Sequence, residues 1–275
     1  MCIRDRANIL IAAALALATP FFIFFGWLSD KIGRKPIILV GCLLAALTYF
    51  PLFNALTGAA NPRLAAAVAE SPVTVYADPA DCHFQFDPVG KTVFNSSCDL
   101  AKTHLAKAGV TYANEAAPAG TVAQVRIGDQ VVDSFNGKVM PKADFDAQKK
   151  TWDAGLTAAL TQAGYPAKAD SALVNKPMVI GILFLLVLYV TMVYGPIAAA
   201  LVEMFPTKVR YTSMSLPYHI GNGWFGGFLP TTAFAMVAAT GNIYYGLWYP
   251  IAIAVLTLIV GVLFVKEGKD VDIHD

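Results

Sequence analysis

The chain has 275 residues, of which 56% are hydrophobic and 14% are charged, and its formal net charge is +1 at pH 7. A composition this apolar is typical of a protein that lies largely in lipid, and it argues against a soluble enzyme. The sequence contains no block of basic residues of the kind that binds nucleic acid, so no nucleic-acid partner is expected.

The chain begins with six residues, M-C-I-R-D-R, directly before an uncharged apolar run. We interpret residues 1–6 as a leader that is not native, because the apolar run starts without a proper preceding loop. Arg4 and Arg6 would also lie on the outer side of the membrane, against the charge pattern of the other loops. A secretory signal is excluded because the apolar run continues far beyond a short signal segment.

Two apolar runs without Asp, Glu, Lys or Arg follow, from Ala7 to Leu28 and from Pro36 to Leu56. About 20 such residues span the hydrocarbon core as a helix. The segment between them, G-W-L-S-D-K-I-G-R-K from Gly26 to Lys35, carries four charges and two glycines suited to a tight turn. We therefore expect residues 7–56 to form membrane helices 1 and 2, joined by a loop at the membrane surface.

Residues 57–176 interrupt the apolar pattern with many charged residues and frequent Pro, Gly, Asn and Asp. They predict a small water-exposed α+β domain. Alternating apolar residues indicate strands, and spacings of three and four indicate helices, with a tight hairpin turn at Gly128 and Asp129. The expected strands are Val73–Ala77, His83–Phe86, Val122–Ile127 and Gln130–Ser134, and the expected helices are Asp99–Ala108 and Ala143–Ala163.

Cys82 and Cys98 lie within this domain, separated by fifteen residues. In an oxidising compartment we expect them to form a disulfide, and two unpaired thiols are the alternative. Asp81, Cys82 and His83 are adjacent, but neighbours in an extended strand point to opposite faces. No second His or Cys pair has the spacing of a zinc site, so we expect no metal site, no cofactor and no enzymatic activity.

Two further uncharged runs extend from Pro177 to Val202 and from Tyr211 to Val265, and Thr240 to Asn242 divide the second run into two spans. Residues 177–265 should therefore form membrane helices 3 to 5, followed by a tail at residues 266–275. Cations in short loops favour the cytoplasm. This rule places the C-terminus in the cytoplasm and residues 57–176 outside, on the evidence of Lys31, Arg34, Lys35, Lys208, Arg210, Lys266 and Lys269.

Polar side chains within these spans are candidates for function. Tyr218, His219 and Asn222 would lie near the middle of the fourth span, where alternating-access transporters bind their substrates. Ionisable residues inside a membrane are functional candidates by default, although His219 could equally bond a neighbouring helix. Tyr194 on the third span is a weaker candidate.

The segment from Gly26 to Lys35 resembles the signature loop of the major facilitator superfamily. The segment E-M-F-P-T-K-V-R, from Glu203 to Arg210, resembles a second signature of that family, and Y-x-x-G-N and G-G-x-x-P follow it. Together they are similar to the carboxyl-terminal half of its metabolite:proton symporters. The resemblance covers the five spans and implies an all-α membrane bundle of five helices from a twelve-helix transporter, with the α+β domain inserted.

The resemblance also implies a function. Asp30, Arg34, Glu203 and Arg210 would form one cytoplasmic ion network that acts as a conformational gate. The chain would be a fragment of a secondary active transporter in a bacterial-type inner membrane, taking up an organic acid, proline or betaine with protons by alternating access. Its partners would be the solute, protons, the bilayer and the missing N-terminal half. The alternative is a membrane receptor that binds its ligand through the outer domain.

Overall fold

The computed structural model describes the backbone of residues 3–268 and the side chains of residues 7–268. The predicted leader lies outside the described side chains, as does the predicted tail beyond residue 268. The described residues fall into two compact units. The first comprises residues 3–59, 175–229 and 247–268, and the second comprises residues 60–174 and 230–246.

Within the described residues, four helices are long and apolar enough to cross a membrane, namely Ala7–Ile32, Arg34–Ala60, Lys176–Glu203 and Tyr245–Leu263. The first of these spans is formed by α1 (Ile3–Ala18) and α2 (Pro20–Ile32), which meet at Thr19. A helix restarts readily at Pro20 because proline lacks an N–H group and its φ already suits the first helical turn. The second and third spans are α3 (Arg34–Ala60) and α7 (Lys176–Glu203).

The sequence predicts five spans, and the structure differs at the fourth. This region is divided into α8 (Arg210–His219), the π-helix η2 (Ile220–Gly226) and α9 (Leu229–Thr240). Pro217 removes a helical hydrogen bond, and four glycines between residues 221 and 227 disfavour a regular α-helix. The chain then continues through the 3₁₀ turn η3 (Tyr245–Leu247) into α10 (Trp248–Leu263).

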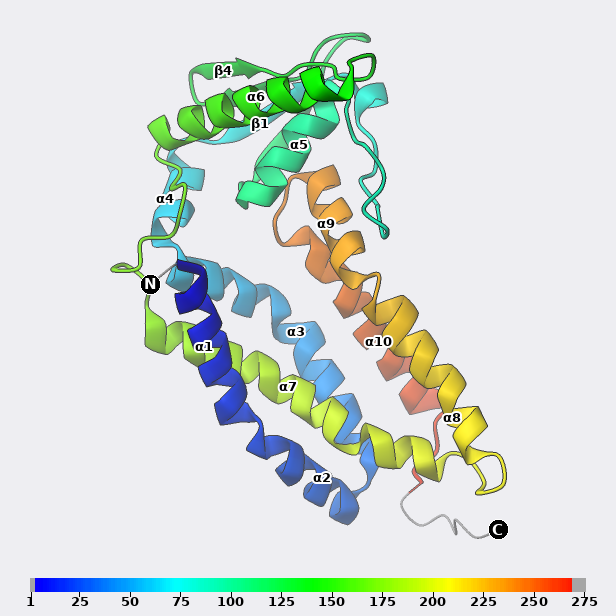
Figure 1. Cartoon of the computed structure of the whole chain (residues 1–275). Coiled ribbons are helices and arrows are strands. Elements are labelled where there is room, and N and C mark those ends of the chain that lie inside the picture. The colour runs from blue at the N-terminus through cyan, green and yellow to red at the C-terminus, as the bar shows by residue number, and fades with distance from the viewer. Residues whose placement is uncertain (1–2, 269–275) are drawn as a thin grey trace. The chain divides into compact units, whose positions relative to one another are not determined.

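In the first unit, α7 packs along both α1 and α2 (Figure 1). Small residues allow close approach between membrane helices. A Cβ atom added at Gly195 of α7 would lie 3.2 Å from the carbonyl oxygen of Phe22. Farther along the same pair of helices, the rings of Phe21 and Phe184 meet edge to face with their centroids 5.6 Å apart.

The second unit contains a four-stranded sheet of order β2-β1-β3-β4. Its central strand β1 (Val73–Ala77) pairs in parallel with β2 (Tyr112–Ala116) and antiparallel with β3 (Gln124–Ile127), which pairs antiparallel with β4 (Gln130–Asp133). The helical elements of this unit are α4 (Pro62–Glu70), the 3₁₀ turn η1 (Pro79–Asp81), α5 (Ser97–Ala108) and α6 (Lys142–Gln162).

One face of this sheet forms the core of the unit. Val73, Val75 and Ala77 alternate with more exposed residues along β1, and their side chains are buried. They share a cluster with Leu105 of α5 and Leu156 of α6. A small sheet with helices therefore exists in this part of the chain, between α3 and α7 in the sequence.

Residues outside the predicted domain also pack in this unit. The Tyr112 hydroxyl donates to the Ala238 carbonyl at 2.6 Å, and the Tyr112 N–H donates to the Gly241 carbonyl at 2.9 Å. Burial raises the pKa of Tyr112. Residues 230–246 are therefore grouped with the α+β residues, although the sequence assigns them to the membrane portion.

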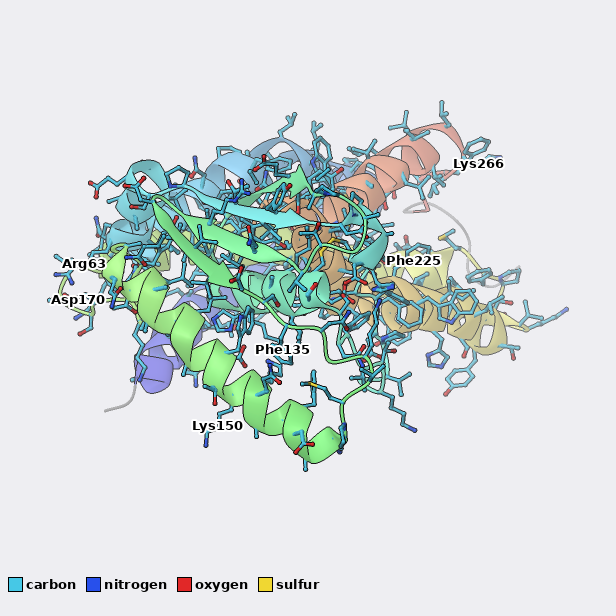
Figure 2. All side chains as sticks on the ribbon, turned by 90° about the horizontal axis from the view of Figure 1, so that it is seen from above. Arg63, Phe135, Lys150, Asp170, Phe225 and Lys266 are labelled. Atoms are coloured by element: carbon cyan, nitrogen blue, oxygen red, sulfur yellow. A yellow bond between two sulfur atoms is a disulfide. The ribbon has the colours of Figure 1, made fainter. Side chains whose placement is uncertain are left out.

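Most predicted elements of this domain lie within three residues of the observed ones, but the predicted strand His83–Phe86 is wrong. The His83 N–H donates to Asp99 Oδ1 at 2.8 Å, and the Gln85 side chain donates to the Asp99 carbonyl at 2.9 Å, so this segment bonds α5 rather than a neighbouring strand. The sequence missed β2 and α4. Arg63 of α4 lies beside Asp170, with Nη2 and Oδ2 3.6 Å apart (Figure 2).

Asp153 of α6 generates a pH prediction. Burial alone would raise the pKa of this carboxyl group, but hydrogen bonds from Lys149 and His104, at 2.6 and 2.8 Å, lower it below its ordinary value. A depressed pKa contributes stability above the unfolded value of about 3.9, and this stability is lost as the pH falls through the folded value. Asp153→Asn removes this titrating group. The unfolding free energy of the unit should therefore fall less steeply below about pH 4 in the variant than in the unaltered chain.

The measurement is urea unfolding followed by the fluorescence of Trp152, in a chain with Trp27→Phe, Trp224→Phe and Trp248→Phe. The matched control is Asp146→Asn, an exposed carboxylate on the same helix. Equal acid dependence in both variants would contradict the assignment.

Candidate functional site

A one-residue turn organises the charged site that the sequence predicts. Helix α2 ends at Ile32 and α3 begins at Arg34, so only Gly33 lies between them. Gly33 has a φ of 101°, a conformation that favours glycine. A Cβ atom at this position would also collide with the carboxylate of Glu267. Gly26, which the sequence also assigns to the turn, lies inside α2, because the helix continues to Ile32.

Arg34 is the centre of the charged cluster. Its Nη2 atom lies 2.9 Å from Glu203 Oε1, and its Nε–H donates to the same oxygen at 3.1 Å. Its Nη1 atom lies 2.6 Å from Asp30 Oδ1 and also donates to the hydroxyl of the buried Ser29 at 3.2 Å. The guanidinium group thus joins the end of α2 to the C-terminus of α7.

The two carboxylates that bind Arg34 differ in environment. The side chain of Glu203 is 13% exposed and that of Asp30 is 65% exposed. Glu203 Oε2 is buried, and no hydrogen-bond partner reaches it from the described part of the chain. Glu203 consequently depends on Arg34 for compensation of its charge, whereas water can solvate Asp30.

Arg210, the fourth predicted member, does not join this cluster within residues 3–268. Its Nε–H donates to the Phe205 carbonyl at 3.1 Å, across the turn that follows α7. The segment Met204 to Val209 separates α7 from α8 and includes Pro206. In this structure Arg210 therefore closes a local turn.

Glu267 is a residue that the sequence analysis missed. Its carboxylate accepts hydrogen bonds from the backbone N–H groups of Arg34 and Lys35, at 3.0 and 3.1 Å, and so caps the N-terminus of α3. In return, Lys35 Nζ donates to the carbonyls of Val262 and Val265 at the end of α10, at 3.3 and 2.8 Å. The two helix ends therefore cap each other.

A cavity of about 570 Å³ adjoins these charges. Most of its lining is apolar and comes from α3, α7 and α10, and its charged residues include Arg34, Glu203 and Glu267. The cavity can therefore hold a largely apolar surface, or the apolar part of a small molecule, beside a charged rim.

The predicted substrate residues lie elsewhere in the first unit. The Tyr194 hydroxyl donates to Asn222 Oδ1 at 3.3 Å, and the Asn222 amide donates to the Tyr218 carbonyl at 3.1 Å. His219 lies next to Tyr218, with the ring centroids 5.8 Å apart. All four side chains are exposed in this structure, and none lines the cavity described above. Their predicted roles stay predictions.

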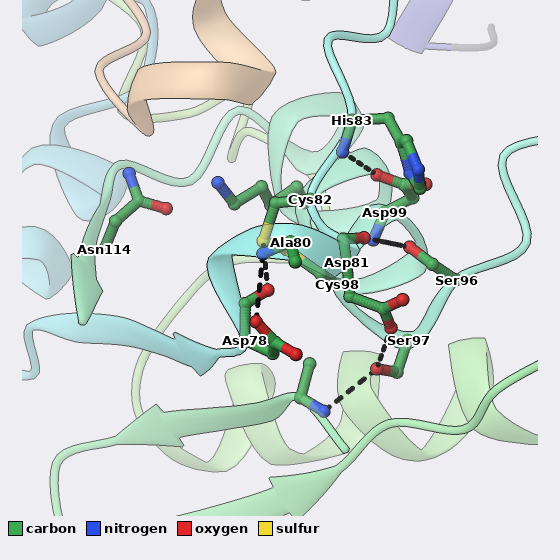
Figure 3. Close-up of a disulfide and its surroundings, with 12 residues drawn as sticks. Asp78, Ala80, Asp81, Cys82, His83, Ser96, Ser97, Cys98, Asp99 and Asn114 are labelled. Atoms are coloured by element: carbon green, nitrogen blue, oxygen red, sulfur yellow. Dashed lines mark hydrogen bonds and ion pairs between the residues drawn. A yellow bond between two sulfur atoms is a disulfide. The ribbon is translucent and has the colours of Figure 1, made fainter. Parts of the chain in front are cut away.

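In the second unit, Cys82 and Cys98 are joined in a disulfide, the pairing that the sequence analysis favours over unpaired thiols (Figure 3). Their Cα atoms are 5.1 Å apart. Cys42, the free cysteine among the described residues, is buried in α3.

The ion cluster generates a stability prediction. Removing one partner of a buried pair costs about 3–5 kcal/mol, whereas an exposed pair contributes about 0–1 kcal/mol. A double-mutant cycle of Arg34→Gln with Glu203→Gln should therefore give a larger interaction energy than the matched cycle with Asp30→Asn. The unfolding free energies would be measured by denaturant titration in mixed micelles. Equal interaction energies in the two cycles would show that burial does not distinguish the pairs.

The chain is similar to known transport proteins over part of its length. Residues 154–275 match the family model for sugar (and other) transporters. A Haemophilus influenzae protein named for metabolite transport is 43% identical over 81 residues, which cover 28% of this chain and 17% of that protein. A second such protein from the same organism is 34% identical, over 30% of this chain and 19% of its own length.

A further relative is the glycine betaine/proline/ectoine/pipecolic acid transporter OusA of Dickeya dadantii, which is 33% identical over 32% of this chain and 18% of its own. The chain thus spans less than a fifth of the length of these curated relatives. No solved structure matches it significantly. Its apolar helices make it a multi-pass membrane protein. Over residues 154–275, and over the segments shared with these relatives, the chain is similar to transporters of the major facilitator superfamily.

Proposed function

We propose that the chain is part of a secondary active transporter that works by alternating access. The observation that carries the proposal is the pair of Arg34 and Glu203, which joins the turn between α2 and α3 to the end of α7. Alternating access requires helices whose contacts exist in one state and are absent in the other. A charged contact at helix ends meets that requirement because it can break without disturbing the packing of the helices themselves.

The proposed gate consists of Asp30, Arg34 and Glu203, with Arg210 retained as a member that joins when the turn after α7 rearranges. Formation of the pair stabilises one state of the transporter, and its loss stabilises the other. A difference of about 1.4 kcal/mol changes the ratio of the two states tenfold. The energy of one partly buried ion pair is therefore sufficient to set the balance.

The proposed cargo is a small polar metabolite, such as an organic acid, proline or betaine, moved together with protons. Support comes from relatives named for metabolite transport and from one named for glycine betaine and proline. We assign substrate contact to Tyr218, His219, Asn222 and Tyr194. The bond between Tyr194 and Asn222 supports this assignment because it links α7 to η2, a π-helix, and such segments are frequent at functional sites. A structural bond from His219 to a neighbouring helix is the alternative.

The proposed setting is a bacterial-type inner membrane, with residues 57–176 outside and the C-terminus in the cytoplasm. An N-terminal half not contained in this chain would complete the substrate path. Transport is favoured over enzymatic turnover by the family match. Ligand recognition by a receptor-like outer domain is not favoured, because the relatives are named as transporters or for transport.

The test is uptake into proteoliposomes by the longest protein that contains this chain. Labelled betaine, proline and an organic acid are supplied with and without a proton gradient, and a protonophore should abolish accumulation. Arg34→Ala should lower the rate of uptake about tenfold or more with little change in substrate affinity, because it shifts the balance of states. Asp30→Asn should lower it less, since Asp30 is more exposed.

The matched control is Lys208→Ala, which removes an exposed cation after α7. Uptake by Arg34→Ala at the normal rate would refute the gate. Accumulation that survives the protonophore would refute proton coupling, and failure to accumulate any of these solutes would refute the proposed cargo.

A further inference from the structure

The disulfide of the second unit joins two very different positions. Cys98 lies in the first turn of α5 and its side chain is fully buried, whereas Cys82 follows η1 and is only partly buried. Figure 3 shows the bond between these two segments. A reagent from solution therefore reaches the sulfur of Cys82 more easily than that of Cys98.

An ionisable pair lies directly beside the disulfide. The pair consists of His83, which follows Cys82, and Asp99, which follows Cys98. His83 Nδ1 lies 2.7 Å from Asp99 Oδ2. The Asp99 side chain is 2% exposed and the His83 ring is 52% exposed. A buried carboxylate next to one cysteine is thus connected to an imidazole that reaches solvent next to the other. The pair ties the segment that carries Cys82 to the first turn of α5, which carries Cys98.

The helix end also distinguishes the two sulfur atoms. Ser96 is the N-cap of α5, and its hydroxyl accepts a hydrogen bond from the Asp99 N–H at 3.0 Å. The N-terminal end of α5 favours negative charge at Cys98, whereas burial of Cys98 in the hydrophobic core opposes it. Attack at the more accessible Cys82 makes Cys98 the leaving group, whichever of these two effects is larger.

We propose that the Cys82–Cys98 disulfide is redox-active and exchanges with an external dithiol. A thiolate of the dithiol attacks Cys82 Sγ, the Cys82–Cys98 bond breaks, and Cys98 leaves as a thiolate. The second thiol of the partner, once deprotonated, then attacks its own sulfur in the mixed disulfide and releases Cys82. Two electrons pass from the partner to the domain, which gains two thiols, and the partner becomes a disulfide.

Hydrogen bonds hold the two segments together independently of this covalent bond. The Ser96 hydroxyl donates to the Asp81 carbonyl at 2.5 Å, and the Ser97 hydroxyl donates to Asp81 Oδ2 at 3.3 Å. The Asp81 carboxylate also pairs with Lys138 Nζ at 2.5 Å. The segments that carry the cysteines therefore remain neighbours when the bond opens, so that reduction is reversible. A purely structural disulfide is the rival explanation.

The first test uses the full chain in detergent with Cys2→Ser and Cys42→Ala, so that only the two cysteines of the pair remain. The protein is equilibrated with graded ratios of reduced and oxidised dithiothreitol, quenched with acid, and labelled with a maleimide that shifts its mobility on a gel. We expect reduction without denaturant, reoxidation when the ratio is reversed, and an unchanged circular dichroism spectrum. Reduction that needs denaturant, or that unfolds the domain, would overturn the proposal.

The second test compares the two single-cysteine variants in the same background. Cys98→Ser leaves Cys82, which should react with an aromatic disulfide about tenfold faster than the Cys98 thiol left by Cys82→Ser, because access controls the rate. Faster reaction of Cys98, or equal rates, would overturn the assigned direction of attack. Both variants are checked by circular dichroism, and the first test decides the proposal if either one fails to fold.

Discussion

The partly buried pair of Arg34 and Glu203 is the interaction on which the membrane part of this chain depends. Glu203 ends α7 with one carboxylate oxygen bound to Arg34 and the other without a partner among the described residues. A charge in such surroundings is stable only while its counter-ion is present. The position of α7 relative to the turn between α2 and α3 is therefore fixed by charge as well as by the aromatic and glycine contacts along the helices.

A second exchange of charges supports the first from the other side of the turn. Glu267 caps α3 while Lys35 binds the last carbonyls of α10, so each helix end supplies what the other lacks. The ends of α2, α3, α7 and α10 thus meet around Gly33. Unlike an isolated surface pair, this arrangement shares its charges among four helices, and a change at one end affects the others.

The sequence predicts the parts of this fold that depend on composition. Uncharged runs of sufficient length identify four spans, and alternating residues identify β1. It does not predict the interruption at η2, because the four glycines there also suit close helix packing. Strand β2 is missed because it lies at the edge of the sheet and only Tyr112 among its residues is buried, so no alternation marks it.

The sequence also predicts only part of the charged site around Arg34. Asp30 and Arg34 follow from spacing, and Glu203 from its resemblance to a family signature, but the role of Glu267 requires a contact across more than two hundred residues. Asp99 shows the same limit. The adjacent residues Asp81 to His83 gave no reason to connect His83 with a carboxylate sixteen residues away, and only the fold of the loop onto α5 brings them together.

The single residue between α2 and α3 has a mechanical consequence. A linker of several residues would let one helix rotate without moving the next one. The single residue Gly33 is too short to allow this. The two helices must therefore rotate together as one rigid unit, and Arg34 lies at the bend between them. Inserting even one residue beside Gly33 would uncouple the motions of α2 and α3, although every side chain of the ion pairs would still be present.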